Sequence, residues 1–237
     1  ETKQEDSKFP YEALKEAGYK TGRIGKYHLA PEQVYAFDEV IKANPRNTVE
    51  MAKNSSDFIK TEAPFFLYFC TDDPHRGYPY KQEDWHQPNP FGNKTEGYEG
   101  VLPITYTPEE VLVPNFLPDS KETRAELAQY YQSVSRMDQG IGLLIHNLKK
   151  NNKYDNTLII YISDNGIAFA GAKTTVYEPG LKLPCIVKQP KARQENMTND
   201  ALINWADLTP TILDYAGLNP SPLKFHGKSF KSILNQF

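Results

Sequence analysis

Apolar side chains along this chain recur in two patterns, one typical of helices and the other of buried strands. Over residues 122–150 they recur at steps of three and four, as on one face of an α-helix. Residues 65–70 and 157–162 are instead continuous apolar runs, which are typical of strands covered on both faces. Helices that alternate with such strands predict an α/β fold with a mostly parallel sheet and helices on both faces. We expect the run 65–70 to be a central strand.

Five shorter elements complete the expected order. They are helices over 9–17, 48–60 and 207–216 and strands over 21–24 and 184–187. Gly18 and Gly217 stand where a left-handed residue commonly ends a helix. Asp207 is positioned as the N-cap of the last helix.

The segment 72–120 differs in character from the rest of the chain. It contains eight prolines and four glycines, so regular structure cannot extend far within it. A loop of this length in a compact domain is usually functional or disordered. Its aromatic side chains favour an ordered loop that packs on the body of the protein; they are Tyr78, Tyr80, Trp85, Phe91, Tyr98 and Tyr106.

Composition narrows the class of protein. A chain of 237 residues, 39% hydrophobic and 24% charged, suits one soluble globular domain or most of one. The net charge of −3 gives no general attraction to nucleic acid or to an anionic membrane. No apolar run approaches the roughly 20 residues of a membrane-spanning helix. Cys70 and Cys185 lie in apolar runs, which favours buried free thiols. Residues 1–7 lack the apolar segment of a secretory signal, and we expect the chain to begin in mid-domain.

Polar residues that could carry chemistry directly follow three of the expected strands. They are Lys26 and His28 after 21–24, His75 after 65–70, and Asp164 and Asn165 after 157–162. In open α/β sheets, ligands bind beyond the carboxyl ends of the strands. We therefore expect these side chains to share one site.

Each of these residues has a functional and a plainly structural interpretation. Asp164 and Asn165 offer adjacent oxygen ligands of the kind that calcium and magnesium prefer, or an Asx turn that closes a strand. Lys26 and His28 face one site if their segment is extended, or belong to a solvated loop. His75 is a candidate general acid.

Other titratable residues are weighed in the same way. Lys173 lies nine residues beyond Asp164, after small residues that allow close approach to a ligand, although a surface lysine is the alternative. Asp72 and Asp73 fit an orienting or loop-capping role beside the neighbouring histidine better than a metal site. Two further histidines favour structural interpretations: His146 on the long helix and His226 in a turn.

Together these segments resemble the sulfatase family. Residues 14–29 are similar to its second signature, 163–166 to its distal metal-binding turn, and 207–214 to a helix near the end of its large domain. Within the family the chain is most similar to the sulfamidase branch. That similarity lies in the segments 73–76 (Asp-Pro-His-Arg), 91–93, 111–114, 136–140 and 164–167 with Phe169.

The resemblance implies an alkaline-phosphatase-like fold and a hydrolase that removes sulfate from a sulfated glycan, with a unit of the N-sulfoglucosamine type as the expected substrate. The chemistry it implies uses a formylglycine nucleophile and a calcium ion. It assigns calcium binding to Asp164 and Asn165, sulfate binding to Lys26 and Lys173, protonation of the leaving group to His75, and contact with the formylglycine to His28. A sulfated saccharide is the implied partner, and a periplasmic, extracellular or lysosomal setting follows by analogy.

The chain also departs from the family pattern. Sulfamidases carry arginine where this chain has Lys173, and 177–180 is more similar to the wider family, which leaves O-sulfated substrates open. Neither Cys70 nor Cys185 begins the Cys-x-Pro/Ala-x-Arg motif that yields formylglycine. An upstream Asp-Asp pair and most of the smaller C-terminal subdomain are also missing. We therefore expect the chain alone to be inactive, and to self-associate through apolar surface that the missing parts would cover.

Two other functions remain open from the sequence. One is a phosphoryl hydrolase of the alkaline-phosphatase-like superfamily, which typically binds two zinc ions through more Asp and His ligands than the clusters here supply. The other is a non-catalytic protein that binds sulfated glycan through the cationic residues of the site. Desulfation by this chain would exclude the second.

Overall fold

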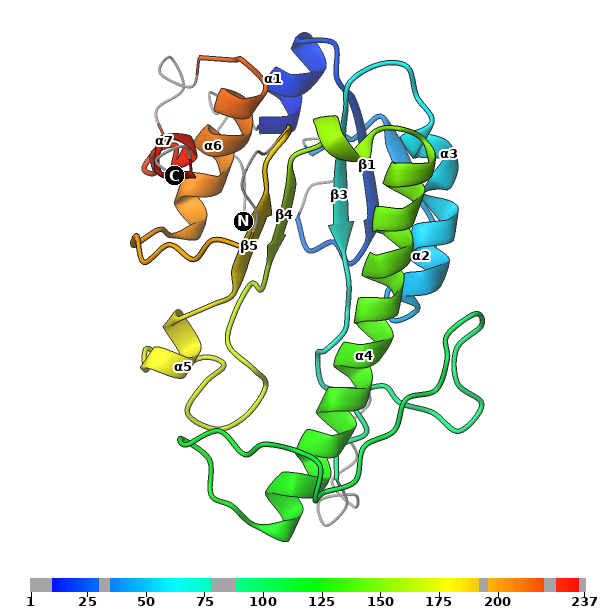
Figure 1. The fold of residues 1–237 in the computed structure, drawn as a ribbon, viewed down its shortest axis with the longest axis vertical. Helices are drawn as coiled ribbons and strands as arrows, with labels where there is room; N and C mark the ends of the chain where they lie inside the picture. Colours follow the sequence, from blue (N-terminus) through cyan, green and yellow to red (C-terminus); the bar gives the residue numbers. More distant parts are fainter. Residues whose placement is uncertain (1–9, 30–34, 78–87, 192–195, 220–224, 235–237) are drawn as a thin grey trace.

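The computed structural model describes residues 10–29, 35–77, 88–191, 196–219 and 225–234. Within these residues, strands and helices alternate along the chain and form an α/β fold, as predicted (Figure 1). None of the described helices is long and apolar enough to cross a membrane. Of the aromatic residues expected in the long loop, Tyr78, Tyr80 and Trp85 lie outside the described residues.

The first sheet contains three parallel strands. Strand β1 (Lys20–Gly25) lies between β2 (Glu39–Ile41) and β3 (Phe65–Cys70). The prediction that 65–70 is the central strand is therefore wrong for the described sheet, where β3 is an edge strand and Tyr68 is 38% exposed. The apolar run shows that both faces of the strand are suited to burial, but it does not say which strands pair with it. In the central strand β1, the ring of Phe58 packs so closely on Gly22 that a Cβ there would lie 2.5 Å from it.

The second sheet is an antiparallel pair. Strand β4 (Ile159–Ile162) pairs with β5 (Cys185–Lys188) in the antiparallel direction, which a mostly parallel fold allows. Strands β3 and β4 run in the same direction in Figure 1, and the loops that follow them reach the same end of the molecule. Among the described residues, β3 pairs only with β1 and β4 pairs only with β5. Each of these two strands therefore has one unpaired edge.

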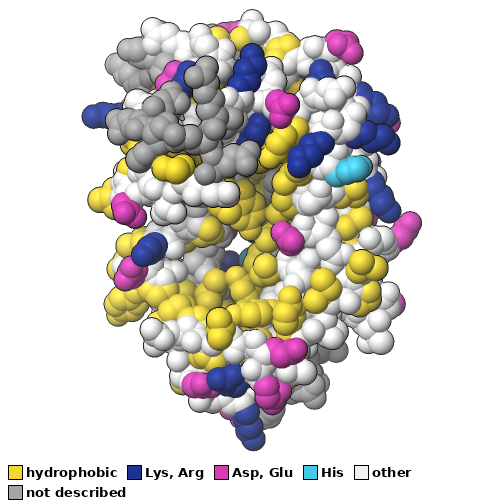
Figure 2. Space-filling model, in the orientation of Figure 1, with side chains coloured by type: hydrophobic (Ala, Val, Ile, Leu, Met, Phe, Trp, Pro, Cys, Tyr) yellow, Lys and Arg dark blue, Asp and Glu magenta, His cyan; other side chains and the backbone are white. Residues whose placement is uncertain are grey.

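The facing edges of β3 and β4 predict self-association of the isolated chain. Figure 2 shows a central hollow bordered by hydrophobic side chains between the two halves of the molecule. Unpaired strand edges and contiguous apolar surface both favour association with another chain. Light scattering of residues 1–237 is expected to give a mass above the 27.0 kDa of one chain that rises with protein concentration. A constant mass of one chain over that range would contradict this expectation.

Seven α-helices surround the two sheets in the described part of the chain. They are α1 (Pro10–Glu16), α2 (Thr48–Asn54), α3 (Ser56–Ile59), α4 (Lys121–Lys150), α5 (Glu178–Leu181), α6 (Leu208–Tyr215) and α7 (Lys231–Leu234). Helices α2, α3 and α4 gather on the side of the first sheet, and α6 and α7 lie on the side of β5 (Figure 1). Two 3-10 turns, Tyr154–Asn156 and Trp205–Asp207, precede β4 and α6.

Two of the predicted helices differ in detail. The helix expected over 48–60 is split at Ser55, whose hydroxyl donates to the Met51 carbonyl at 2.8 Å and competes with the regular helical bonds. Asp207 stands at the start of α6 but makes no N-cap bond there. Its carboxylate instead accepts from the backbone N–H of Asn204 at 2.9 Å and of Lys228 at 2.8 Å.

Helix α4 packs on α2 at Gly140, and this contact predicts how substitutions on α4 change the free energy of unfolding. A Cβ at Gly140 would collide with the backbone of Thr48, whereas a Cβ at Gly142, two residues along the same helix, meets nothing within 4 Å. Gly142→Ala is expected to stabilise the protein by up to about 1 kcal/mol through helix propensity. Gly140→Ala is expected to destabilise it by about 1–3 kcal/mol through overpacking. Urea unfolding of both variants measures the difference; equal effects would contradict the close packing.

The described part of the long loop, 71–77 and 88–120, contains no helix or strand, and it is anchored by buried side chains. Phe91 and Val111 are 0% and 2% exposed, and they pack with Leu127 and Ala128 of α4 and with Phe169 from the loop after β4. The loop after β3 and the loop after β4 therefore share one hydrophobic cluster. This cluster joins the two segments that carry most of the candidate site.

Candidate active site at the carboxyl ends of the strands

The candidate site residues lie on the loops that leave β1, β3 and β4. Strands β1 and β3 are parallel and in register, with Gly25 opposite Cys70, so their carboxyl ends lie together. Gly25 has φ of 85°, and a Cβ there would collide with the Cys70 carbonyl oxygen. The next residue, Lys26, donates its backbone N–H to that same oxygen at 2.8 Å. Glycine at position 25 therefore allows Lys26 to lie directly against the end of β3.

Lys26 and Asp164 both influence the thiol of Cys70 at the end of β3. Burial raises the pKa of the Cys70 thiol, Asp164 and Asp72 raise it further, and the positive charge of Lys26 opposes the rise. The pKa of Tyr68 is also raised, first by burial and also by Asp164. Asp164 after β4 thus acts on side chains of β3, although the two strands do not pair. The Cys70 thiol itself is free, half-buried and disfavoured as a thiolate.

Asp164 and Asn165 lie in the turn after β4, where the Ser163 hydroxyl donates to the Asn165 carbonyl oxygen at 2.7 Å. The Asp164 side chain is exposed and Asn165 is half-buried. Among the described residues, neither side chain takes part in a hydrogen bond or ion pair, so their oxygens are available to a ligand. Asp164 and Asn165 can therefore form the turn that closes β4 and also offer their oxygens to a metal ion.

The donor chemistry of this pair fits a calcium ion only in part. A carboxylate and an amide carbonyl are oxygen donors of the right type, but calcium takes about 6–8 oxygen ligands. Within the described part of the chain, no three His, Cys, Asp or Glu side chains lie together as a metal-binding group. Asp164 and Asn165 can therefore supply part of a calcium shell but not a complete one.

His28 and Lys173 occupy the outer parts of the same loops. His28 is exposed on the segment that follows β1, and Lys173 is half-buried beyond β4. The Lys173 backbone N–H donates to Ile167 at 3.1 Å, which folds the segment 167–173 back on itself. The structure thus places Lys173 on the same loop as Asp164. His146 is exposed on α4, and His226 is exposed before α7, as expected of residues outside the site.

His75 is held in one orientation by its own loop. Its backbone N–H donates to the Asp72 carbonyl at 2.7 Å, and its ring Nδ1 lies 2.9 Å from the Arg76 carbonyl oxygen. Because a carbonyl oxygen only accepts, Nδ1 carries the hydrogen of this bond. Among the described residues, no partner binds Nε2, which is therefore the nitrogen available to exchange a proton with a substrate.

Two arginines around Asp73 support this loop. Asp73 is 3% exposed, and its carboxylate accepts from Arg136 Nε at 2.6 Å, Arg136 Nη2 at 2.9 Å and Arg46 Nη1 at 2.9 Å. Burial raises the pKa of Asp73, and the two guanidinium groups oppose that rise. The predicted orienting role of Asp73 thus has a structural basis. Sequence reasoning missed both arginines, although Arg136 is a charged residue on the buried face of the long helix.

Arg76 links the loop after β3 to the loop after β4. Its Nε donates to the Ala168 carbonyl at 2.7 Å, and its Nη2 donates to Glu126 of α4 at 2.8 Å. Its guanidinium lies 5.0 Å from the ring centroids of both Phe91 and Phe169. Through these contacts Arg76 fixes the position of the His75 loop relative to the loop that carries Asp164 and Lys173.

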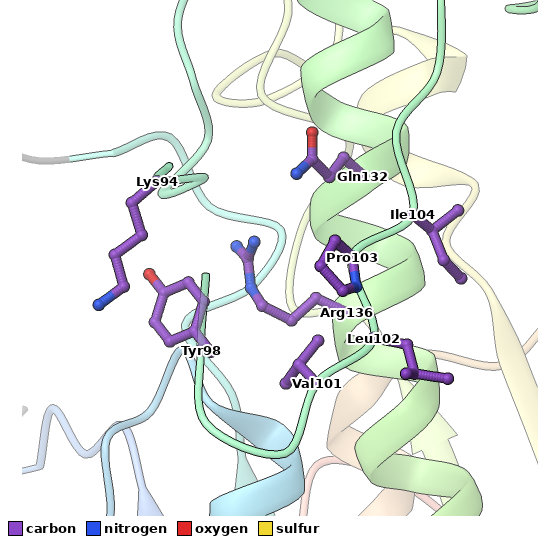
Figure 3. Close-up of a pocket in the computed structure, with 8 residues that line it drawn as sticks. All are labelled: Lys94, Tyr98, Val101, Leu102, Pro103, Ile104, Gln132 and Arg136. Carbon is purple, nitrogen blue, oxygen red and sulfur yellow. The ribbon is translucent and has the colours of Figure 1, made fainter. Parts of the chain in front are cut away.

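A pocket lies between the long loop and helix α4 (Figure 3). It is lined by Lys94, Tyr98, Val101, Leu102, Pro103, Ile104, Gln132 and Arg136. The Arg136 guanidinium and the Lys94 ammonium each lie 4.6 Å from the Tyr98 ring centroid. None of the candidate residues identified from the sequence lines this pocket. Part of its wall is formed by Arg136, the arginine that also binds Asp73.

An α/β fold with cationic, imidazole and carboxylate groups at the carboxyl ends of its strands is typical of a hydrolase that acts on an anionic group. The family model named Sulfatase matches residues 9–218, and the chain belongs to the sulfatase family. The predicted resemblance is therefore confirmed. The chain is 37% identical to human N-sulphoglucosamine sulphohydrolase over 215 residues, which is 85% of this chain and 43% of that protein.

A second relative and two solved structures are also similar to this chain, the structures in fold. A Bacteroides thetaiotaomicron N-acetylglucosamine-6-O-sulfatase is 35% identical over 113 residues, 46% of this chain and 20% of that protein. A structure in complex with its substrate D-glucosamine-2-N,6-O-disulfate superimposes with a TM-score of 0.68 at 21% identity, covering 99% of this chain and 66% of that one. A putative sulfatase from Bacteroides fragilis gives 0.65 at 21% identity, covering 91% and 57%. The chain spans less than half the length of the curated relatives named here.

Proposed function

We propose that this chain carries part of the active site of a sulfatase that removes sulfate from a sulfated glycan, with an N-sulfoglucosamine unit as the expected substrate. The observation that carries the proposal is the placement of Lys26, His75 and Asp164 on the loops that leave β1, β3 and β4 at the same end of the molecule (Figure 1). The similarity to human N-sulphoglucosamine sulphohydrolase supports the N-sulfated substrate. The similarity to an N-acetylglucosamine-6-O-sulfatase and the lysine at position 173 keep an O-sulfated sugar as the second candidate.

The chain's own residues have distinct roles in this proposal. Lys26 and Lys173 hold the sulfate oxygens through charge-assisted hydrogen bonds. His75 gives the proton on Nε2 to the leaving amine or alcohol, because its Nδ1 is engaged with the Arg76 carbonyl. His28, exposed after β1, contacts the nucleophile, which the Cys70 and Cys185 segments do not supply.

Sulfatases generally use a calcium ion, and Asp164 and Asn165 are its proposed ligands here. A bound calcium ion would supply positive charge that neutralises sulfate oxygens during attack at sulfur. The remaining ligands and the formylglycine are proposed to come from polypeptide outside these 237 residues.

Weak calcium binding by residues 1–237 is the expected result of this partial ligand set. The dissociation constant should be no tighter than the ~10⁻⁴–10⁻³ M of weak extracellular calcium modules. Isothermal titration calorimetry measures it, with Asp164→Asn expected to remove the binding and Asp155→Asn, on the exposed turn before β4, expected to leave it unchanged. Tight stoichiometric binding by the unaltered chain would contradict a partial site.

The proposed function is tested by measuring sulfate release with ion chromatography. The chain alone and the longer polypeptide that contains it are incubated with N-sulfoglucosamine, with N-acetylglucosamine 6-O-sulfate and with a sugar phosphate. Release from N-sulfoglucosamine by the longer polypeptide, and none by the chain alone, is expected. Release from the O-sulfated sugar only would change the substrate class, and phosphate release would favour a phosphoryl hydrolase. Saturable binding of both sulfated sugars without release would favour a glycan-binding protein.

A further inference from the structure

One side chain, that of Arg46, donates several hydrogen bonds to the loop 72–76. Arg46, which precedes α2, donates from Nη1 to Asp73 at 2.9 Å and to the His75 carbonyl at 3.1 Å, and from Nη2 to the Arg76 carbonyl at 2.9 Å. The carbonyl of its neighbour Pro45 accepts from the Asp72 backbone N–H at 2.9 Å. The segment 45–46 therefore binds four of the five positions 72–76, all except Pro74.

The Arg76 carbonyl has two partners of different kinds. It accepts from Arg46 Nη2, and it also accepts from the His75 ring at Nδ1. An oxygen with two lone pairs can satisfy both donors at once. Arg46 therefore fixes the oxygen that in turn fixes the imidazole, both in its orientation and in the nitrogen that carries hydrogen in the neutral ring.

The Arg46 guanidinium is closely packed, and the residue at position 92 must be a glycine to leave room for it. Its side chain is only 16% exposed, and a Cβ at Gly92 would lie 2.5 Å from Nη1. A planar guanidinium with donors on two nitrogens can reach the His75 and Arg76 carbonyls and the Asp73 carboxylate together. A lysine ammonium would keep the charge beside Asp73 but lacks this fork.

We infer that Arg46 is a positioning residue for His75, holding the Arg76 carbonyl so that His75 keeps hydrogen on Nδ1 and presents Nε2 to the substrate. The inference rests on the proposed function for the role of Nε2, but the tautomer itself is a property of the chain. Without this restraint, the neutral ring would shift toward the Nε2–H tautomer, which unconstrained histidine favours in water. In that tautomer the unprotonated nitrogen is Nδ1. The ring would then take up a proton on Nδ1 and not on Nε2, the nitrogen that faces the substrate.

The experiment is ¹⁵N NMR of the histidine rings in residues 1–237, with the His75 signals assigned by their loss in His75→Gln. The unaltered chain is expected to show His75 as the Nδ1–H tautomer at a pH where the ring is neutral. In Arg46→Lys, the ratio of Nδ1–H to Nε2–H should fall by about fivefold, the equivalent of one ordinary hydrogen bond. The matched control is Arg124→Lys. Arg124 also binds a carboxylate, Asp119, and two backbone carbonyls, but far from His75 in the hydrogen-bond network, and it should leave the ratio unchanged.

An Nε2–H tautomer in the unaltered chain would overturn the inference even if Arg46→Lys failed to fold. An unchanged ratio in a folded Arg46→Lys variant would overturn it as well. The proposed function fails separately: if His75→Gln leaves sulfate release by the longer polypeptide unchanged, His75 is not the acid. A tautomer shift in Arg46→Lys would then still support the positioning contact.

Discussion

Asp73→Asn lowers the free energy of unfolding by about 3–5 kcal/mol, the cost expected when one partner of a buried ion pair is removed. Asparagine has nearly the same shape, but it removes the negative charge that lies between Arg46 and Arg136. Those side chains are only 16% and 5% exposed, so water cannot replace the lost carboxylate. Urea unfolding followed by circular dichroism measures the loss.

The control for this variant is Asp119→Asn on the surface. Asp119 also pairs with an arginine, Arg124, at 2.5 Å and 2.8 Å, but its side chain is 58% exposed. Exposed pairs contribute about 0–1 kcal/mol, and a change in that range is expected. Similar effects of the two variants would show that burial of Asp73 does not decide the stability of its cluster.

His75→Gln in the longer polypeptide lowers kcat for N-sulfoglucosamine by about 10²–10⁴-fold, the range for loss of a general acid. KM should change little, because sulfate binding is assigned to the lysines. An aryl sulfate whose leaving phenol needs no protonation should lose much less activity, and this difference separates acid catalysis from a general loss of structure. Steady-state kinetics with both substrates measures it.

The control for the kinetic test is His146→Gln. His146 is exposed on α4 and outside the loops of the site, so both substrates should react at the rate of the unaltered protein. Equal losses with the two substrates in His75→Gln would contradict the assignment of His75 as the acid.

The order of helices and strands could be predicted from the sequence because it depends on local periodicity. The apolar stripe over 122–150 matches α4, and the left-handed φ angles of Gly18 and Gly217 match the predicted helix ends. Strand pairing could not be predicted in the same way. The apolar run of β3 is compatible with an edge or a central position, and nothing local to 184–187 distinguishes antiparallel from parallel pairing.

The candidate site was predicted where its residues follow strands, and missed where they support those residues from a distance. Lys26, His75 and Asp164 each follow a predicted strand, so their common location follows from the fold class. Arg46 follows no strand signal, and its contacts with the His75 loop join positions 29 and 30 residues apart. Such contacts depend on how separate elements pack against one another. The spacing of apolar residues along the sequence does not predict that packing.

The Asp73 cluster also sets a time at which the site can form during synthesis. Arg136 follows Asp73 by 63 residues, so the carboxylate is made well before the arginine that binds it through two nitrogens. At about 5–20 residues per second, the ribosome needs roughly 3–13 s to add that stretch. Until Arg136 is present, a buried Asp73 carboxylate would be paired only with Arg46. The His75 loop is therefore expected to stay exposed to water until then. The part of the site nearest the chemistry is thus completed only when the long helix α4 has emerged.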